Sequence, residues 1–225
     1  MKTYCLDTKK KFLKHFGSIR KKRDVILLLL DTMMLFHTKI DEVSFLGDFA
    51  NLSVDSDDDI SIVFHIDKMK RVFFYTKDKI HSMCFPFSIN LDESIKIYFH
   101  EEMIDCALIS KLITIFLDET FEDIYGLTEM AMSSEVIENW VEIDEMLLYK
   151  LVLHLIQFED GYLRFDFNDS ENEQVEYHPL NHIDFYYSNS NTLKLGLTNQ
   201  LNFTDSIEII DTSKKCYFIN KTNKI

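Results

Sequence analysis

Two runs of strictly alternating residues stand near the end of the chain, on either side of an acidic segment. Residues 163–168 read LRFDFN and residues 182–187 read HIDFYY. Alternation of this kind is typical of a strand that buries one face, because successive side chains point to opposite sides. If the two strands pair as a hairpin, cross-strand neighbours bring Arg164, Asp166, His182 and Asp184 onto one common face.

Helical spacing of apolar residues marks three other regions. The first extends from Phe12 to Phe36 and is interrupted near Gly17, which predicts one broken helix or two. Residues 101–119 form a second pattern, with acidic residues in the first turn where they suit the helix dipole. Residues 134–158 form a third, and Gly161 follows its end. We therefore expect several helices before the alternating strands.

The remaining apolar runs predict strands. Residues 60–66 and 71–76 are rich in β-branched and aromatic residues and are separated by a short polar stretch, so they predict a hairpin. Residues 83–87, 94–99 and 192–197 are further strand candidates, and residues 206–210 and 216–219 are expected to close the chain as two short strands or as one strand and a frayed terminus. The predicted fold class is α+β, with helices packed on antiparallel sheet and a strand-rich C-terminal third.

Composition favours one compact body. The 225 residues include only 5 Gly and 2 Pro, so no flexible linker is evident, and we expect a single domain over residues 1–225. A subdivision into residues 1–100, helix plus sheet, and residues 101–225, helices plus C-terminal sheet, is the alternative. The four cysteines are widely spaced, which indicates reduced thiols and a cytoplasmic protein, and no apolar stretch approaches about 18 residues, so we expect no membrane association.

Charge restricts the partners. The formal net charge is −14, but residues 1–24 carry nine Lys or Arg against two acids, and residues 212–225 carry four Lys and no acid. An acidic body repels nucleic acid, so binding of nucleic acid or a nucleotide would use the basic ends, such as residues 20–23, or a local basic pocket. A protein partner or a homo-oligomer formed through the basic arm is the alternative, and solvated surface charge is the simplest interpretation.

The polar residues of the alternating strands and the turn between them are the candidate site. We expect the catalytic residues to be Arg164, Asp166, His178 and His182, with Lys194 and Asp184 binding substrate. Imidazoles titrate near neutral pH, so the two histidines could serve as acid and base, while Arg164 or Lys194 holds a phosphate and Asp166 orients a histidine.

Two other interpretations of the same residues stay open. The two histidines with Asp166 or Asp184 could form a three-ligand divalent metal site with one open position, although Pro179 makes a helical zinc pair of His178 and His182 unfavourable. Alternatively, Arg164 and Asp166 belong to an ion-pair ladder on a solvated sheet face, and the histidines cap a turn. On such an open face, truncating Arg164, His178 or His182 would cost about 1 kcal/mol each.

The segment from Leu163 to Ile210 resembles an uncharacterised bacterial family, domain of unknown function 2290. The resemblance lies in Arg164-x-Asp166, an acidic spacer, and His178-Pro179-x-x-His182. It departs at Lys194, where the family has arginine followed by isoleucine and proline. Members of that family look like accessory genes of bacterial defence and mobile elements, and no reaction is attached to them.

Two functions follow as expectations. The first is a bacterial defence or toxin-like protein, a possible nuclease or other hydrolase of a phosphodiester or nucleotide. The second is a non-catalytic acidic interaction or sensor subunit of a defence system. The sequence has no P-loop, no Gly-x-Ser-x-Gly and no dinucleotide fingerprint, which leaves ATPase, serine hydrolase and Rossmann oxidoreductase functions without support.

Overall fold

A computed structural model describes residues 3–17, 19–46, 52, 54–65, 69–90, 96–118, 145–167, 179–188 and 191–216. Contacts divide the chain into two compact units. Unit 1 consists of Met1–Lys9, Ser44–Cys84 and Gly161–Ile225, and unit 2 consists of Lys10–Val43 and Phe85–Asp160. The chain therefore leaves unit 1 twice and returns to it twice, and these boundaries differ from the subdivision at residue 100 suggested by the sequence.

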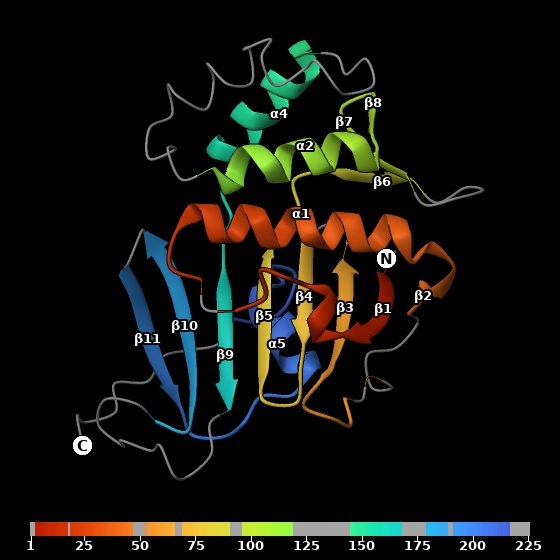
Figure 1. Ribbon diagram of the computed structural model, residues 1–225. Coiled ribbons are helices and arrows are strands. Elements are labelled where there is room, and N and C mark those ends of the chain that lie inside the picture. The colour runs from red at the N-terminus through yellow and green to blue at the C-terminus, as the bar shows by residue number, and fades with distance from the viewer. Residues whose placement is uncertain are drawn as a thin grey trace. The chain divides into compact units, whose positions relative to one another are not determined.

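Unit 1 is built on an eight-stranded sheet in which every neighbouring pair is antiparallel (Figure 1). The strands in spatial order are β11 (Asn191–Leu197), β10 (Asn181–Ser188), β9 (Leu163–Phe167), β5 (Lys79–Cys84), β4 (Arg71–Tyr75), β3 (Asp59–His65), β1 (Thr3–Lys9) and β2 (Ser44–Phe45). The predicted α+β class, the hairpin of β3 and β4, and the strand-rich C-terminal third are confirmed.

Helix α5 (Phe203–Ile210) packs on one face of this sheet. Phe203 and Ile207, one helical turn apart, join a buried cluster that contains Val63, Phe73 and Phe165 from three different strands. The prediction of a strand at residues 206–210 is wrong. The side chain of Asn202 accepts a hydrogen bond from the backbone of Asp205 and the Asp205 side chain accepts one in return, so this capping box starts a helix.

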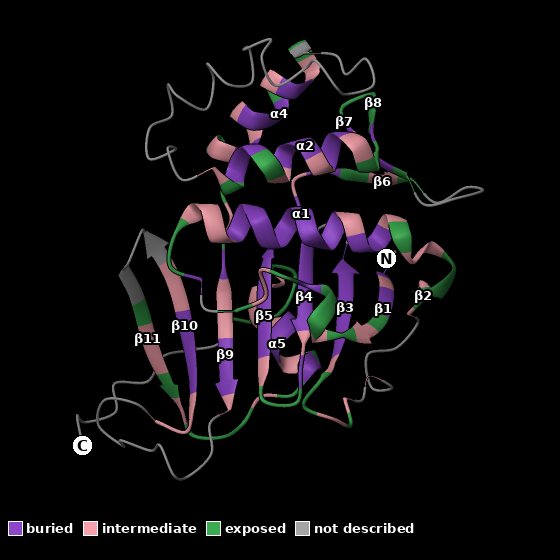
Figure 2. Cartoon of the chain, viewed as in Figure 1, coloured by how far each residue is buried: buried purple, intermediate pink, exposed green. Residues whose placement is uncertain are grey.

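The central strands β3, β4 and β5 are buried along most of their length (Figure 2). Both faces of β3 and β4 are apolar at their centres: Val63 and Phe73 lie on the α5 side, while Ile62 and Phe74 lie on the other, and all four are fully buried. Burial on two faces explains why β3 and β4 have nearly continuous apolar runs, whereas β9 and β10 alternate.

Unit 2 contains three described helices and a small sheet. The helices are α1 (Lys22–Thr38), α2 (Cys106–Leu117) and α4 (Glu145–Gln157), and the antiparallel sheet has the order β6 (Ser88–Asn90), β7 (Lys96–Phe99) and β8 (Glu102–Ile104). The two 3-10 helices of the described chain are η1 (Lys10–Phe12) and η2 (Ile40–Glu42). Buried apolar residues of α1 and α2, such as Leu29, Met33, Leu112 and Phe116, supply much of this unit's core.

Several boundaries that the sequence predicts for helices are wrong. The predicted helical start at Phe12 falls in η1, because residues 3–9 before it already form strand β1, and the regular helix begins only at Lys22. The predicted helix over residues 101–119 begins at Cys106, where Asp105 caps it by accepting a hydrogen bond from Leu108 N. Part of the predicted helix over residues 134–158, and of the strand over 216–219, lies outside the described residues.

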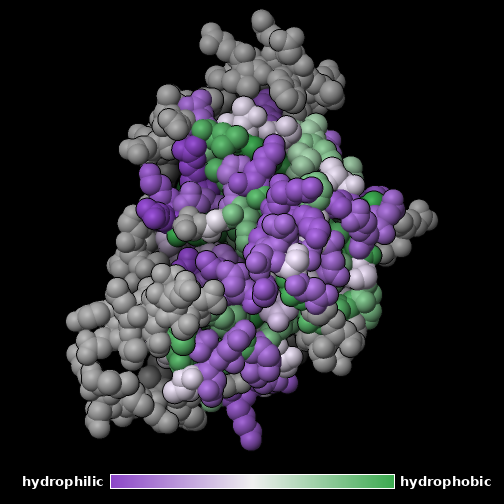
Figure 3. Space-filling view, turned by 60° about the horizontal axis from the view of Figure 1, so that its bottom comes forward, coloured by the Kyte–Doolittle hydropathy of each residue, from purple (hydrophilic) through white to green (hydrophobic). Residues whose placement is uncertain are grey.

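Within the described part of the chain, no helix has both the length and the apolar character needed to cross a membrane. Hydrophilic residues make up most of the coloured surface on the face shown in Figure 3. This agrees with a sequence in which 28% of the residues are charged.

Candidate functional site

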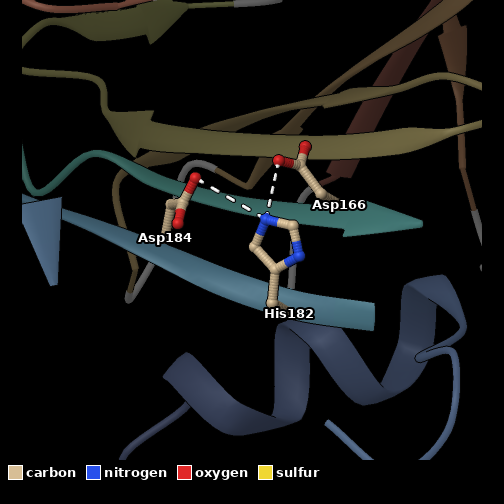
Figure 4. Close-up of side chains that lie close together, drawn as sticks. All are labelled: Asp166, His182 and Asp184. Atoms are coloured by element: carbon tan, nitrogen blue, oxygen red, sulfur yellow. Dashed lines mark ion pairs between the residues drawn. The ribbon is translucent and has the colours of Figure 1, made fainter. Parts of the chain in front are cut away.

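The candidate site lies where β9 pairs with β10 in unit 1. Asp166 stands opposite His182, and Arg164 stands opposite Asp184. Phe165 on β9 and Ile183 on β10 alternate with these residues and point to the other side of the sheet, where they join the core beneath α5. Figure 4 shows Asp166, His182 and Asp184 projecting from the face opposite to this helix. The predicted common face of the two strands is therefore confirmed.

Arg164 bridges the two carboxylates. Its Nε donates to Asp166 Oδ2 at 2.9 Å and its Nη2 lies 2.8 Å from the same oxygen, while Nη2 also donates to Asp184 Oδ2. Burial lowers the pKa of Arg164, but the adjacent carboxylates of Asp166 and Asp184 outweigh burial and raise the pKa above its ordinary value. The guanidinium thus keeps its charge and holds two like charges next to each other.

The ring of His182 is oriented by a backbone carbonyl. Its Nδ1 lies 2.9 Å from Pro179 O, and a carbonyl oxygen can only accept, so Nδ1 carries a hydrogen. The other ring nitrogen, Nε2, lies 3.1 Å from Asp166 Oδ2 and 3.8 Å from Asp184 Oδ2 (Figure 4). The predicted turn-capping contact of a histidine is present, and it aims the opposite nitrogen at two carboxylates.

Lys194 supplies a second cation. It stands opposite Asp184 on β11, and its Nζ lies 3.6 Å from Asp184 Oδ1. His178 lies outside the described residues, so its predicted place in the site stays a prediction. Of the six residues predicted for the site, the structure brings the other five together.

The burial of the group differs from the expectation of an open, solvated face. The exposed fraction of the side chain is 0% for His182, 4% for Asp166 and 10% for Asp184. Only the two cations reach solvent appreciably, with 21% for Arg164 and 29% for Lys194. The expectation of a solvated face is therefore wrong for Asp166, His182 and Asp184. A buried charge that loses its partner is costly, so we expect truncating Arg164 to cost more than about 1 kcal/mol, while the cost expected for His178 stays a prediction.

Sequence reasoning missed one extension of this network. His81 on β5 stands opposite Arg164, and its Nδ1 lies 2.8 Å from the hydroxyl of Tyr162. Burial raises the pKa of the Tyr162 hydroxyl above its ordinary value, and the nearby Asp166 carboxylate adds to the effect while Arg164 opposes it. No local pattern in the sequence links β5 to a strand so distant along the chain, so the sequence carries no signal for this contact.

The group combines three kinds of chemistry. Two carboxylates face two cations, so the charges of the four side chains balance when the imidazole is neutral. The cations could bind an anionic group, and the carboxylates could accept a proton. Asp166, His182 and Asp184 each offer one ligand atom, with all three atoms within 4.8 Å of one another, so these residues could also hold a metal ion.

Comparison of the chain with protein-family models, with curated proteins and with solved structures found no match. The resemblance of residues 163–210 to an uncharacterised bacterial family stays a prediction. A function is therefore inferred below from the chemistry of these residues.

Proposed function

We propose that the protein is a hydrolase of a phosphodiester or a nucleotide, in a bacterial defence or toxin-like setting, and that the group around Arg164 is its reactive centre. The observation that carries the proposal is the convergence of Arg164 and Lys194 on Asp184. Both cations are partly exposed and both contact the same carboxylate, so together they are suited to bind one doubly charged or bridging phosphate.

Burial divides the roles of these residues. Arg164 and Lys194 are the groups that a phosphate can reach, whereas His182 has no exposed side-chain surface and is out of contact with a large substrate. A phosphate that takes the place of Asp184 as their partner releases the Asp184 carboxylate. A carboxylate beside a bound phosphate is a general base for the attacking water. His182 and Asp166 then act as positioning residues for Asp184 and Arg164.

Replacing Lys194 with methionine is expected to lower the rate of hydrolysis about 100-fold, the usual cost of losing one group that stabilises charge in the transition state. The rate is measured on labelled RNA, on labelled single-stranded DNA and on a chromogenic phosphodiester. Lys214→Met is the matched control, since Lys214 belongs to the same unit and forms an ion pair with Glu208 at 3.4 Å, away from the site. Equal rates for the two variants, at equal melting temperature, contradict the assignment.

One observation favours a second candidate function. Each charged side chain of the site contacts an opposite charge, as in a structural ion-pair network. In that case the protein is a non-catalytic acidic interaction or sensor subunit of a defence system. Toxicity of the expressed protein that Lys194→Met abolishes supports the hydrolase. A cellular phenotype that survives Lys194→Met, together with no turnover of any phosphodiester, supports the interaction subunit.

The basic cluster at residues 20–23 is partly used within unit 2. Arg23 Nη2 donates to Leu117 O at 2.7 Å, and Lys22 Nζ lies 3.4 Å from Asp160 Oδ2, whereas Arg20 and Lys21 are exposed. We expect the double variant Arg20→Gln, Lys21→Gln to bind any nucleic acid more weakly. The slope of the logarithm of the binding constant against the logarithm of salt concentration should become less steep by up to about two. Titrations at several salt concentrations measure this, and an unchanged slope identifies the cluster as surface charge without a role in binding.

A further inference from the structure

We propose that Asp166, His182 and Asp184 bind one divalent transition-metal ion. The Nε2 atom of His182 lies 3.1 Å and 3.8 Å from the nearest oxygens of the two carboxylates. Ligand atoms arranged tetrahedrally at a zinc-like bond length lie about 3.3–3.6 Å from one another. Both distances from the imidazole nitrogen are therefore close to the spacing of metal ligands, and all three ligand atoms lie within 4.8 Å of one another.

The orientation of His182 supports the same assignment. The hydrogen bond from Nδ1 to Pro179 O leaves the lone pair of a neutral ring on Nε2, pointed at two carboxylate oxygens. A lone pair facing two anions is unfavourable unless a cation or a proton lies between them. Metal-binding histidines commonly donate their other N–H to a backbone carbonyl, which is the contact that Pro179 provides.

Asp166 provides an independent observation. Its Oδ1 is buried, and among the described residues no donor forms a hydrogen bond with it. An ionised oxygen in this position loses its hydration without compensation. A cation bound to the same carboxylate would reduce this cost, because the two oxygens share the negative charge. Asp184 Oδ1 is in a similar position, because the Lys194 ammonium at 3.6 Å is beyond hydrogen-bonding distance.

The ligand set restricts the kind of ion. One imidazole nitrogen and two carboxylate oxygens, with a position left open, suit Zn²⁺, Mn²⁺, Fe²⁺ or Co²⁺. Calcium takes six to eight oxygen ligands, which is more than these residues offer. An ion here would lie next to the position at which the proposed hydrolase binds phosphate. Metal binding nevertheless stands on its own geometry and does not depend on that reaction.

Arg164 is the competitor that the ion has to overcome. Its guanidinium contacts the Oδ2 atoms of both carboxylates, which are the oxygens nearest to His182 Nε2. A divalent ion on these atoms repels the guanidinium at close range, so binding moves Arg164 away. Because 21% of this side chain is exposed, it has a route toward solvent. Removing Arg164 should therefore tighten metal binding, an effect opposite to that of removing a ligand.

The test uses the 225-residue chain after treatment with a chelator. Calorimetric titration with Zn²⁺ and the visible absorption of added Co²⁺ report binding without any substrate. We expect one ion per chain, an affinity at least about 100-fold lower in His182→Gln and in Asp166→Asn, and an affinity at least about tenfold higher in Arg164→Ala. His154→Gln is the matched control, because His154 also lies against a proline carbonyl, Pro86 O at 3.2 Å, but belongs to unit 2.

Two outcomes overturn the proposal: no ion bound by either the wild type or Arg164→Ala, or the same affinity in His182→Gln as in His154→Gln. Should His182→Gln or Asp166→Asn fail to fold, Arg164→Ala decides, since a metal-dependent rise in its melting temperature supports the site and its absence refutes it. An ion that binds as expected to a protein without any hydrolytic activity supports the metal site and refutes the proposed hydrolase.

Discussion

Arg164→Ala is expected to lower the free energy of unfolding by about 3 kcal/mol, at the lower end of the range for breaking a buried ion pair because the side chain retains some exposure. The variant leaves Asp166 and Asp184 side by side, both buried, with Lys194 as the remaining described cation in contact. Their mutual repulsion is no longer screened by the guanidinium. Chemical denaturation followed by circular dichroism measures the change.

The matched control for Arg164→Ala is Lys9→Ala. Lys9 pairs with Asp59 in the same sheet, but half of the Lys9 side chain is exposed, so its removal should cost far less. A loss of stability that is similar in the two variants would show that the Arg164 network is no more than a surface ion pair. It would also remove the electrostatic reason for treating the buried carboxylates as unusual.

Phe165→Ala should cost about 3–5 kcal/mol, the usual range for truncating a fully buried phenylalanine. Phe165 has no exposed surface and contacts the core cluster that includes Phe203 of α5. Phe167 is the natural comparison, because it lies two residues further on the same face of β9 but is only partly buried. Phe167→Ala should therefore cost clearly less.

Thermal and chemical unfolding of the two phenylalanine variants gives the comparison. If Phe167→Ala proved as costly as Phe165→Ala, the centre of the unit 1 core would lie further toward the end of β9 than the contacts indicate. Both variants keep every polar residue of the site. Loss of metal binding in a variant that remains folded would therefore point to a shift of β9 and not to loss of a ligand.

The local sequence pattern was sufficient to place the candidate residues on one face. Alternation in residues 163–168 and 182–187 is a property of each strand alone, and it fixes which side each residue takes once the strands pair. The burial of that face could not be predicted from this alternation. His182, Asp166 and Asp184 look like solvated residues in a polar–apolar alternation, yet they are covered, and covering depends on chain segments that the alternation does not specify.

The errors in the secondary structure predicted for the two ends of the chain have separate causes. Residues 3–9 were not predicted as a strand, because β1 owes its place to pairing with β3 more than fifty residues later. Residues 206–210 contain a short apolar run that suits a strand or a helix equally well. The signal that decides it is the pair Asn202 and Asp205, a capping box that lies just before the run and was not recognised.

The repeated crossing of the chain between the two units imposes an order on folding. β3, β4 and β5 follow one another in sequence and can pair as soon as they are synthesised, but β9 pairs with β5 only after the whole of Phe85–Asp160 has been made. Until then β5 is a bare edge, the type of surface that recruits strands from other chains. Asp166, His182 and Asp184 all belong to the late strands β9 and β10, so they join the rest of the sheet only through the long-range pairing of β9 with β5. A nascent chain halted before Gly161 would carry an aggregation-prone edge and none of these three residues.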